Sequence, residues 1–168
     1  MNRLAFAEFL RQNAAMEIKP IVLKSVNRAF DVFQRDLEAI PADAFNRSLG
    51  GKARTVADIA YEVMLVNEDA CANMRGEPGS EWDEGWLKAP ADFQSKEIVT
   101  AAFAEASAKV IAQIESYSEE ELQAKVTCEW GETDRFERCR FIALHTWYHG
   151  GQLNFIQTLL GDDEWHWG

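Results

Sequence analysis

Two of the three histidines in the chain, His145 and His149, lie in one short stretch, LHTWYHGGQL at residues 144–153. In an α-helix, side chains four residues apart lie on the same face, with Cβ atoms about 5–6 Å apart. Two imidazoles in this arrangement can bind one metal ion, or they can be hydrogen-bonded residues of a core. Because two histidines do not complete a tight metal site, the first interpretation requires at least one further ligand from elsewhere in the chain.

Glu62 is the main candidate for that further ligand. It lies in the apolar run IAYEVMLV at residues 59–66, and a glutamate is rarely buried without a partner. The histidine pair is also surrounded by apolar residues, where a metal ion would satisfy both imidazoles. Asp58 lies one turn before Glu62 and Asp69 two turns after it, and both remain alternative ligands.

The elements that would position these residues are helices. Apolar residues recur at three- and four-residue intervals along most of the chain, as one face of a helix requires. Four long helices are predicted, at residues 16–39, 56–74, 93–117 and 135–160. The first begins near Pro20, and Thr55 with Asp58 forms a capping signal before the second. Together they predict an all-α fold, a four-helix bundle that forms a single domain over residues 1–168.

The sequence defines the short elements and the spatial order of the helices less clearly than the long helices. A short extra helix is expected over residues 4–15, before the first long one. Residues 125–134 are interpreted as a loop or as a short β-like segment. Ile98 is expected to face the core from the third long helix. The helical periodicity does not decide between a simple up-down order and an order that includes a crossover.

Composition and charge narrow the class of partner. The 168 residues are 47% hydrophobic, which is enough for one domain with a real core. The net charge of −11 and the lack of a basic cluster argue against nucleic acid, including a role on DNA, and against anionic membranes. No apolar run reaches the roughly 18 residues of a membrane span and no secretory signal is recognisable, so we expect a cytoplasmic protein. Cys71, Cys128 and Cys139 are expected to be free thiols.

Two segments resemble a known family. RTVADIAYEVMLVNE at residues 54–68 and HTWYHGGQLNFIQTLLG at residues 145–161 are similar to the DinB/YfiT-like family of metal-dependent four-helix-bundle proteins. In that family a histidine of the second helix and an H-x-x-x-H-x-G-Q motif on the last helix form the metal site. Glu62 stands where the first histidine usually stands, so the resemblance implies the ligand set Glu62, His145 and His149. Such a set suits a divalent transition metal, namely zinc, nickel or iron.

The resemblance also implies a function. It indicates a metal-dependent enzyme, either a thiol-dependent transferase or a hydrolase, in which the metal activates a thiol or a water. The partner would be a small-molecule substrate, such as a thiol, and the protein would form a homodimer. Because Glu62 replaces a histidine, a bundle that binds a metal or small molecule without catalysis is the alternative. Trp82 and Trp86 lie in a loop expected to cover the metal site or a dimer surface, and His166 lies on a tail expected to pack on the bundle.

Overall fold

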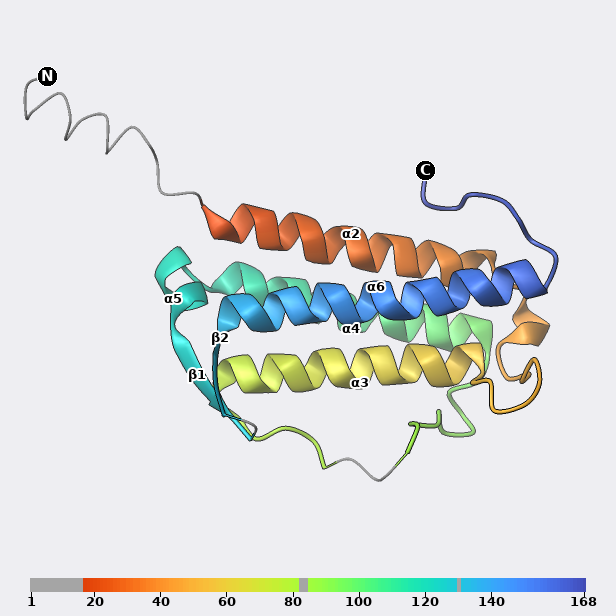
Figure 1. Ribbon diagram of the computed structural model, residues 1–168, viewed down its shortest axis with the longest axis horizontal. Helices are drawn as coiled ribbons and strands as arrows, with labels where there is room; N and C mark the ends of the chain where they lie inside the picture. The colour runs from red at the N-terminus through yellow and green to blue at the C-terminus, as the bar shows by residue number, and fades with distance from the viewer. Residues whose placement is uncertain (1–16, 82–84, 130) are drawn as a thin grey trace, which may run out of the picture.

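The computed structural model describes residues 17–81, 85–129 and 131–168. The short helix expected over residues 4–15 and the side chain of Trp82 lie outside these described residues. Four long helices form the body of the molecule (Figure 1): α2 at Ile18–Ala39, α3 at Val56–Arg75, α4 at Lys96–Ser116 and α6 at Arg135–Leu159. The predicted all-α four-helix bundle is therefore confirmed.

The order of the helices includes a crossover. α2 packs against α4 and α6, and α3 packs against the same two helices, so α2 and α3 are diagonally opposed. In Figure 1, α2 and α6 run from left to right, whereas α3 and α4 both run from right to left. The segment at residues 76–95 must therefore return along the length of the bundle to connect two parallel helices. As a result, α3 and α6 are antiparallel neighbours, and each carries part of the predicted site.

Short elements close the two ends of the bundle. A 3₁₀ turn, η1 at Ala42–Ala44, follows α2, and a one-turn helix, α5 at Glu119–Gln123, follows α4. Between α5 and α6 the chain forms an antiparallel hairpin of β1 at Lys125–Cys128 and β2 at Gly131–Asp134. The segment interpreted as a loop or short β-like stretch is thus a hairpin. Asp134 ends it and also caps α6, because its carboxylate accepts from the Glu137 N–H at 2.8 Å.

Local sequence accounts for the start and end of α3. The Thr55 hydroxyl accepts from the backbone N–H of Asp58 at 3.1 Å, and the Asp58 carboxylate accepts from the backbone N–H of Thr55 at 3.4 Å. This reciprocal capping box satisfies two backbone donors that the first turn leaves free. At the other end, Gly76 adopts a φ of 77°, a left-handed conformation that favours glycine. α3 therefore holds Glu62 in a defined position.

The core lies between the four long helices and is aromatic at its centre. The Phe33 and Phe103 rings lie 4.7 Å apart between centroids, and Phe30 meets Phe103 edge-on at 5.8 Å. On α4 the buried side chains include Val99 and Phe103, whereas Ile98 is 48% exposed. The prediction that Ile98 faces the core is therefore wrong. The buried face of α4 is displaced by one residue, so that Val99 points inward and Ile98 does not.

A buried carboxylate on α2 anchors the chain that follows α6. Asp36 is fully buried, and its Oδ1 accepts from Trp167 Nε1 at 2.9 Å and from Asn154 Nδ2 at 3.1 Å. Burial raises the pKa of Asp36 to about 6, although these hydrogen bonds oppose the change. His166, next to Trp167, lies 2.8 Å from the Asp162 carboxylate within the same tail. The tail expected to pack on the bundle does so through Trp167.

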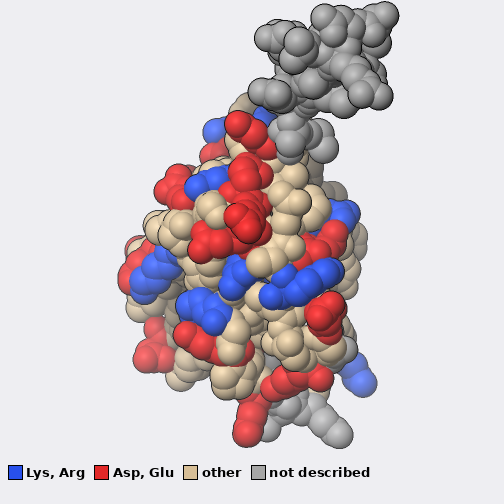
Figure 2. Space-filling view, turned by 90° about the vertical axis from the view of Figure 1, so that its left-hand side faces the viewer, with Lys and Arg blue, Asp and Glu red and all other residues tan. Residues whose placement is uncertain are grey.

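The surface carries charges of both signs. Figure 2 shows the end of the molecule that lies on the left in Figure 1, and acidic side chains gather in the upper half of this view. Basic side chains are interspersed among acidic ones and do not form a continuous patch on this face. Within the described ranges, no helix is both long enough and apolar enough to cross a membrane.

Candidate metal centre

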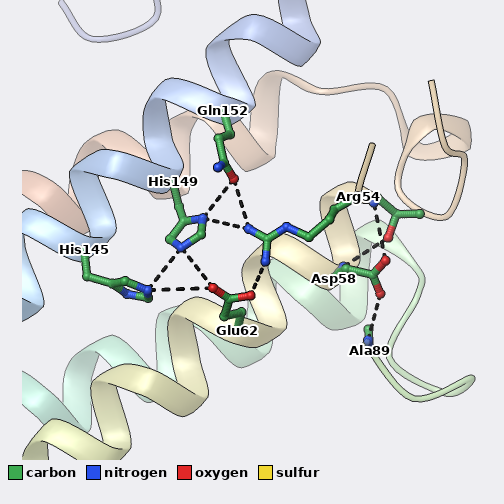
Figure 3. A network of polar contacts seen from close by, with 8 residues as sticks. Arg54, Asp58, Glu62, Ala89, His145, His149 and Gln152 are labelled. Atoms are coloured by element: carbon green, nitrogen blue, oxygen red, sulfur yellow. Dashed lines mark hydrogen bonds and ion pairs between the residues drawn. The ribbon is translucent and has the colours of Figure 1, made fainter. Parts of the chain in front are cut away.

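The three predicted ligands come together between α3 and α6. Figure 3 shows Glu62 on α3 facing His145 and His149, which lie one turn apart on α6. The Nε2 atoms of the two histidines lie 3.1 Å apart, and Glu62 Oε1 lies 3.3 Å from Nε2 of His149 and 4.0 Å from Nε2 of His145. All three donor atoms fall within 4.8 Å of one another.

The cluster is largely withdrawn from solvent. The His149 side chain is 1% exposed, and those of His145 and Glu62 are 13% and 12% exposed. One turn further along, a hydrogen bond of 3.2 Å from Asn67 Nδ2 to Thr146 Oγ1 ties α3 to α6 within the core. Both of these residues are buried, so the bond holds the two helices in register beside the cluster.

The donor set fits a divalent ion. Ligand atoms about 2.0–2.2 Å from a tetrahedral zinc ion lie roughly 3.3–3.6 Å apart. The separations of 3.1 and 3.3 Å are close to this range, and the separation of 4.0 Å requires only a small side-chain rotation. Nδ1 of His145, the ring nitrogen outside this cluster, is buried without a hydrogen-bond partner among the described residues, so His145 lacks the orienting contact that His149 has. Two imidazoles and one carboxylate are ligands typical of zinc with an open position and of ferrous iron.

Gln152 orients the second histidine. Its Oε1 lies 2.9 Å from Nδ1 of His149, three residues earlier on α6. When Nδ1 carries the proton, it donates to Gln152 and leaves the Nε2 lone pair directed at Glu62 and His145. Metal-binding histidines are commonly fixed in this way through their second ring nitrogen. The Gln of the HGGQ segment therefore has a physical role in the site.

Arg54 is the polar neighbour that sequence reasoning missed. Its Nη1 donates to Glu62 Oε2 in a close ion pair, and its Nη2 donates to Gln152 Oε1 at 3.0 Å (Figure 3). The same Nη2 lies 3.0 Å from Nδ1 of His149. Trp86 covers the guanidinium, with its ring centroid 4.7 Å from Cζ. Arg54 precedes the cap of α3, outside any periodic pattern, so only its place in the RTVADIAYE segment pointed to it.

The electrostatics keep both histidines neutral. Burial, the neighbouring His149 and the Arg54 cation lower the pKa of His145 from 6.5 to about 4. Burial also lowers the pKa of His149, with a contribution from Arg54, while the hydrogen bond to Gln152 and the Glu62 carboxylate act in the opposite direction. Neutral imidazole is the form that binds a metal ion, so the ring nitrogens are available near neutral pH.

The alternative carboxylates are used elsewhere. Asp58 accepts from Thr55 and, through Oδ1, from the backbone N–H of Ala89 at 2.8 Å (Figure 3). Asp69 accepts from the backbone N–H of Ser80. Both therefore hold the segment that crosses from α3 to α4, and neither joins the cluster around Glu62.

Comparison with known proteins identifies the family. The sequence profile of the DinB superfamily matches residues 22–153, which is most of the chain. The chain belongs to the DinB superfamily. The resemblance seen in two segments of the sequence is therefore confirmed over nearly the whole bundle. Among curated proteins, none matches this DinB-superfamily chain in sequence.

Solved structures of similar fold support the same assignment. A DinB-like protein from Bacillus cereus has a TM-score of 0.67 at 10% identity, over 83% of this chain and 91% of that one. A DinB-like protein from Bacillus subtilis has a TM-score of 0.66 at 14% identity, over 85% and 94%. A variant of a mycothiol-dependent maleylpyruvate isomerase has a TM-score of 0.56 at 14% identity, over 80% of this chain and 60% of that one. At these identities the likeness shows a shared DinB fold.

Proposed function

We propose that this DinB-superfamily protein is a divalent-metal-dependent enzyme that acts on a small molecule, with Glu62, His145 and His149 as its metal ligands. The observation that carries the proposal is the convergence of one carboxylate oxygen and two imidazole nitrogens within 4.8 Å. Such a group is rare in a helical core unless an ion or a hydrogen-bond network satisfies it. Zinc, nickel and iron are the metals that this donor set suits.

The residues of the chain would share the work as follows. A divalent ion held by the three ligands supplies a Lewis acid that lowers the pKa of a water or a thiol. Glu62 offsets part of its positive charge, and Gln152 fixes the ring of His149 through Nδ1. In the absence of the ion, Arg54 holds the second oxygen of Glu62, with Trp86 over its guanidinium.

We further propose that the substrate reaction is a thiol-dependent transfer, or a hydrolysis, at this centre. Support comes from the shared fold of a mycothiol-dependent isomerase. This chain spans 60% of the length of that protein, and the two share 14% of their residues. The three buried free cysteines suit a reducing compartment, in keeping with a cytoplasmic protein.

A second candidate function is a bundle that binds a small molecule without catalysis. The ion pair between Arg54 and Glu62 favours it, because Arg54 already neutralises the carboxylate without any metal. In that case His149 would be satisfied by His145 and Gln152, whereas Nδ1 of His145 has no hydrogen-bond partner among the described residues. The two functions differ in whether a divalent ion displaces Arg54 from Glu62.

Metal content separates the two functions. Protein purified without chelator is expected to contain about one divalent ion per chain, and zinc at one hundred times its dissociation constant should stabilise the fold by about 2.7 kcal/mol. The double variant His145→Ala, His149→Ala should lose both the ion and the thermal shift. His166→Ala is the matched control, since His166 lies in the tail and bonds to Asp162. Full occupancy in the double variant would contradict the proposed site.

A further inference from the structure

A cavity of about 460 Å³ lies beside the candidate metal centre. It is bounded by the segment that precedes α3, by Trp86, and by the outer face of α6, and it shares Arg54 and Gln152 with the centre. Its size is that of a small-molecule site. Much of its lining is apolar or aromatic: Leu49, Ile59, Trp86, Tyr148, Phe155 and Leu159.

The aromatic part of this lining is exposed to solvent. Trp86 is 65% exposed, Tyr148 is 59% exposed and Phe155 is 64% exposed. Three aromatic rings that converge on one cavity but remain open to water are suited to hold a flat apolar group. Gly151 also lines the cavity, and a Cβ built there meets no atom within 4 Å, so the absence of a side chain leaves room on the α6 wall.

The lining of the cavity carries two cations. Lys52 and Arg54 both line the cavity, together with the amide of Gln152, and no acidic residue of the described chain does so. In a chain of net charge −11, two cations beside an apolar cavity favour an anionic ligand. A guanidinium is planar and binds carboxylates through parallel hydrogen bonds, which makes Arg54 suited to that group in particular.

Arg54 also connects the cavity to the metal centre. Its guanidinium donates to Glu62 and to Gln152 (Figure 3). Trp86 covers one face of the guanidinium. A divalent ion on Glu62 would compete with Arg54 for that carboxylate. Arg54 would then keep a positive charge that a ligand anion in the cavity can neutralise.

We propose that the cavity binds a small organic carboxylate with an aromatic body, that Arg54 and Lys52 recognise its carboxylate group, and that Arg54 couples this binding to that of the metal ion. The coupling rests on the proposed function, whereas recognition of the carboxylate does not require the metal. Because coupling between two bound ligands is reciprocal, zinc should strengthen carboxylate binding by the same factor as the carboxylate strengthens zinc binding.

Isothermal titration calorimetry with naphthoate and with neutral naphthamide tests the proposal on the full chain. In chelator-treated protein, naphthoate is expected to bind about tenfold more tightly than naphthamide, as one charge-assisted hydrogen bond implies. In zinc-loaded protein, the naphthoate affinity should rise by a further factor of about five to ten, while the naphthamide affinity stays unchanged. Equal affinities for the two compounds, or no binding of naphthoate, would overturn the proposal.

Three variants test which residues of the cavity contact the bound compound. Lys52→Glu should weaken naphthoate about tenfold but leave naphthamide and zinc unchanged, and Lys24→Glu on the exposed surface of α2 is its charge-matched control. Gly151→Leu keeps a helix-compatible residue and should abolish binding of both compounds by filling the cavity. Arg54→Gln should abolish the effect of zinc on naphthoate. A zinc effect that survives Arg54→Gln overturns the coupling, whereas zinc that fails to bind at all contradicts only the proposed metal function.

Discussion

At the scale of single residues, Glu62 has two sets of partners that compete for its carboxylate. One oxygen pairs with Arg54, and the other faces the Nε2 atoms of His145 and His149. In the absence of an ion the pair with Arg54 satisfies the charge of Glu62. With a divalent ion present, Glu62 gains a stronger electrostatic partner, which competes with Arg54 for its carboxylate.

Two substitutions at Glu62 test whether the charge of its side chain is needed for zinc binding. Glu62→Gln keeps the size of the side chain but removes its charge, so we expect zinc affinity to fall by at least about a hundredfold, since even outer partners contribute about 10- to 100-fold. Glu62→His supplies a third imidazole, as in the family motif, and is expected to bind zinc at least as tightly as the natural chain. Competition with a chromogenic chelator measures all three affinities. Equal affinity in the natural chain and Glu62→Gln would show that Glu62 is not a ligand.

The residues of the site were predictable from sequence to different degrees. His145 and His149 stand out by spacing alone, and Glu62 stands out as an acid within an apolar helical run. Arg54 was not predictable in the same way, because it lies before the helix, where no periodicity defines a face. Its approach to Glu62 depends on the fold of the segment that leads into α3, which is a tertiary feature.

At the scale of elements, α2 and the tail after α6 are joined through the buried carboxylate of Asp36. Its pKa of about 6 lies above the ordinary value of 3.8, chiefly because of burial. The folded state therefore holds this proton more tightly than the unfolded state between these two values. Stability contributed by Asp36 is present below about pH 4 and is lost as the pH rises through about 6.

The variant Asp36→Asn isolates this effect. It cannot ionise, so its free energy of unfolding, relative to that of the natural chain, should rise by about 2–3 kcal/mol between about pH 4 and pH 7. Urea denaturation at both pH values measures the difference. His166 is the nearby titrating group, and the comparison is repeated in a His166→Ala background to remove its contribution. A difference that stays constant with pH would contradict the account.

The elements themselves were largely predictable. Local signals such as the capping box of Thr55 and Asp58 set the start of α3, and these act within a few residues. The rotation of α4 was harder, because Ile98 and Val99 are both apolar and only packing against α2 and α3 decides which one faces inward. The hairpin at Lys125–Asp134 was ambiguous because only two short strands pair there.

At the scale of the whole molecule, the path of the chain was not predictable from periodicity. A helical stripe shows which face is buried but not which helices cover it, so the crossover between α3 and α4 required the structure. This path makes α3 and α6 neighbours, and it carries Trp86 to a position over Arg54. The loop that was expected to cover the metal site or a dimer surface thus contacts, through Trp86, a neighbour of Glu62.

We predict that the protein forms a homodimer through the exposed apolar side chains of α6. Leu144 is 69% exposed, Tyr148 59%, Phe155 64% and Leu159 56%, and they recur along one face of the helix. Three of them, Tyr148, Phe155 and Leu159, also line the cavity, so the partner chain would close the open side of that cavity over a bound ligand. Such stripes commonly mark interfaces, and identical chains most often pair about a two-fold axis. Light scattering should give twice the chain mass, and Leu144→Glu should give a monomer. Ile98→Glu, at an exposed position of α4, is the control that should remain a dimer.

The central claim is that Glu62, His145 and His149 hold one divalent ion. A crystal structure of protein prepared without chelator, with anomalous data collected at the zinc, nickel and iron edges, tests it most directly. We expect one anomalous peak within bonding distance of the carboxylate of Glu62 and of both Nε2 atoms, with Arg54 withdrawn from Glu62. Crystals soaked in zinc that show no peak there, with the ion pair between Arg54 and Glu62 intact, would contradict it.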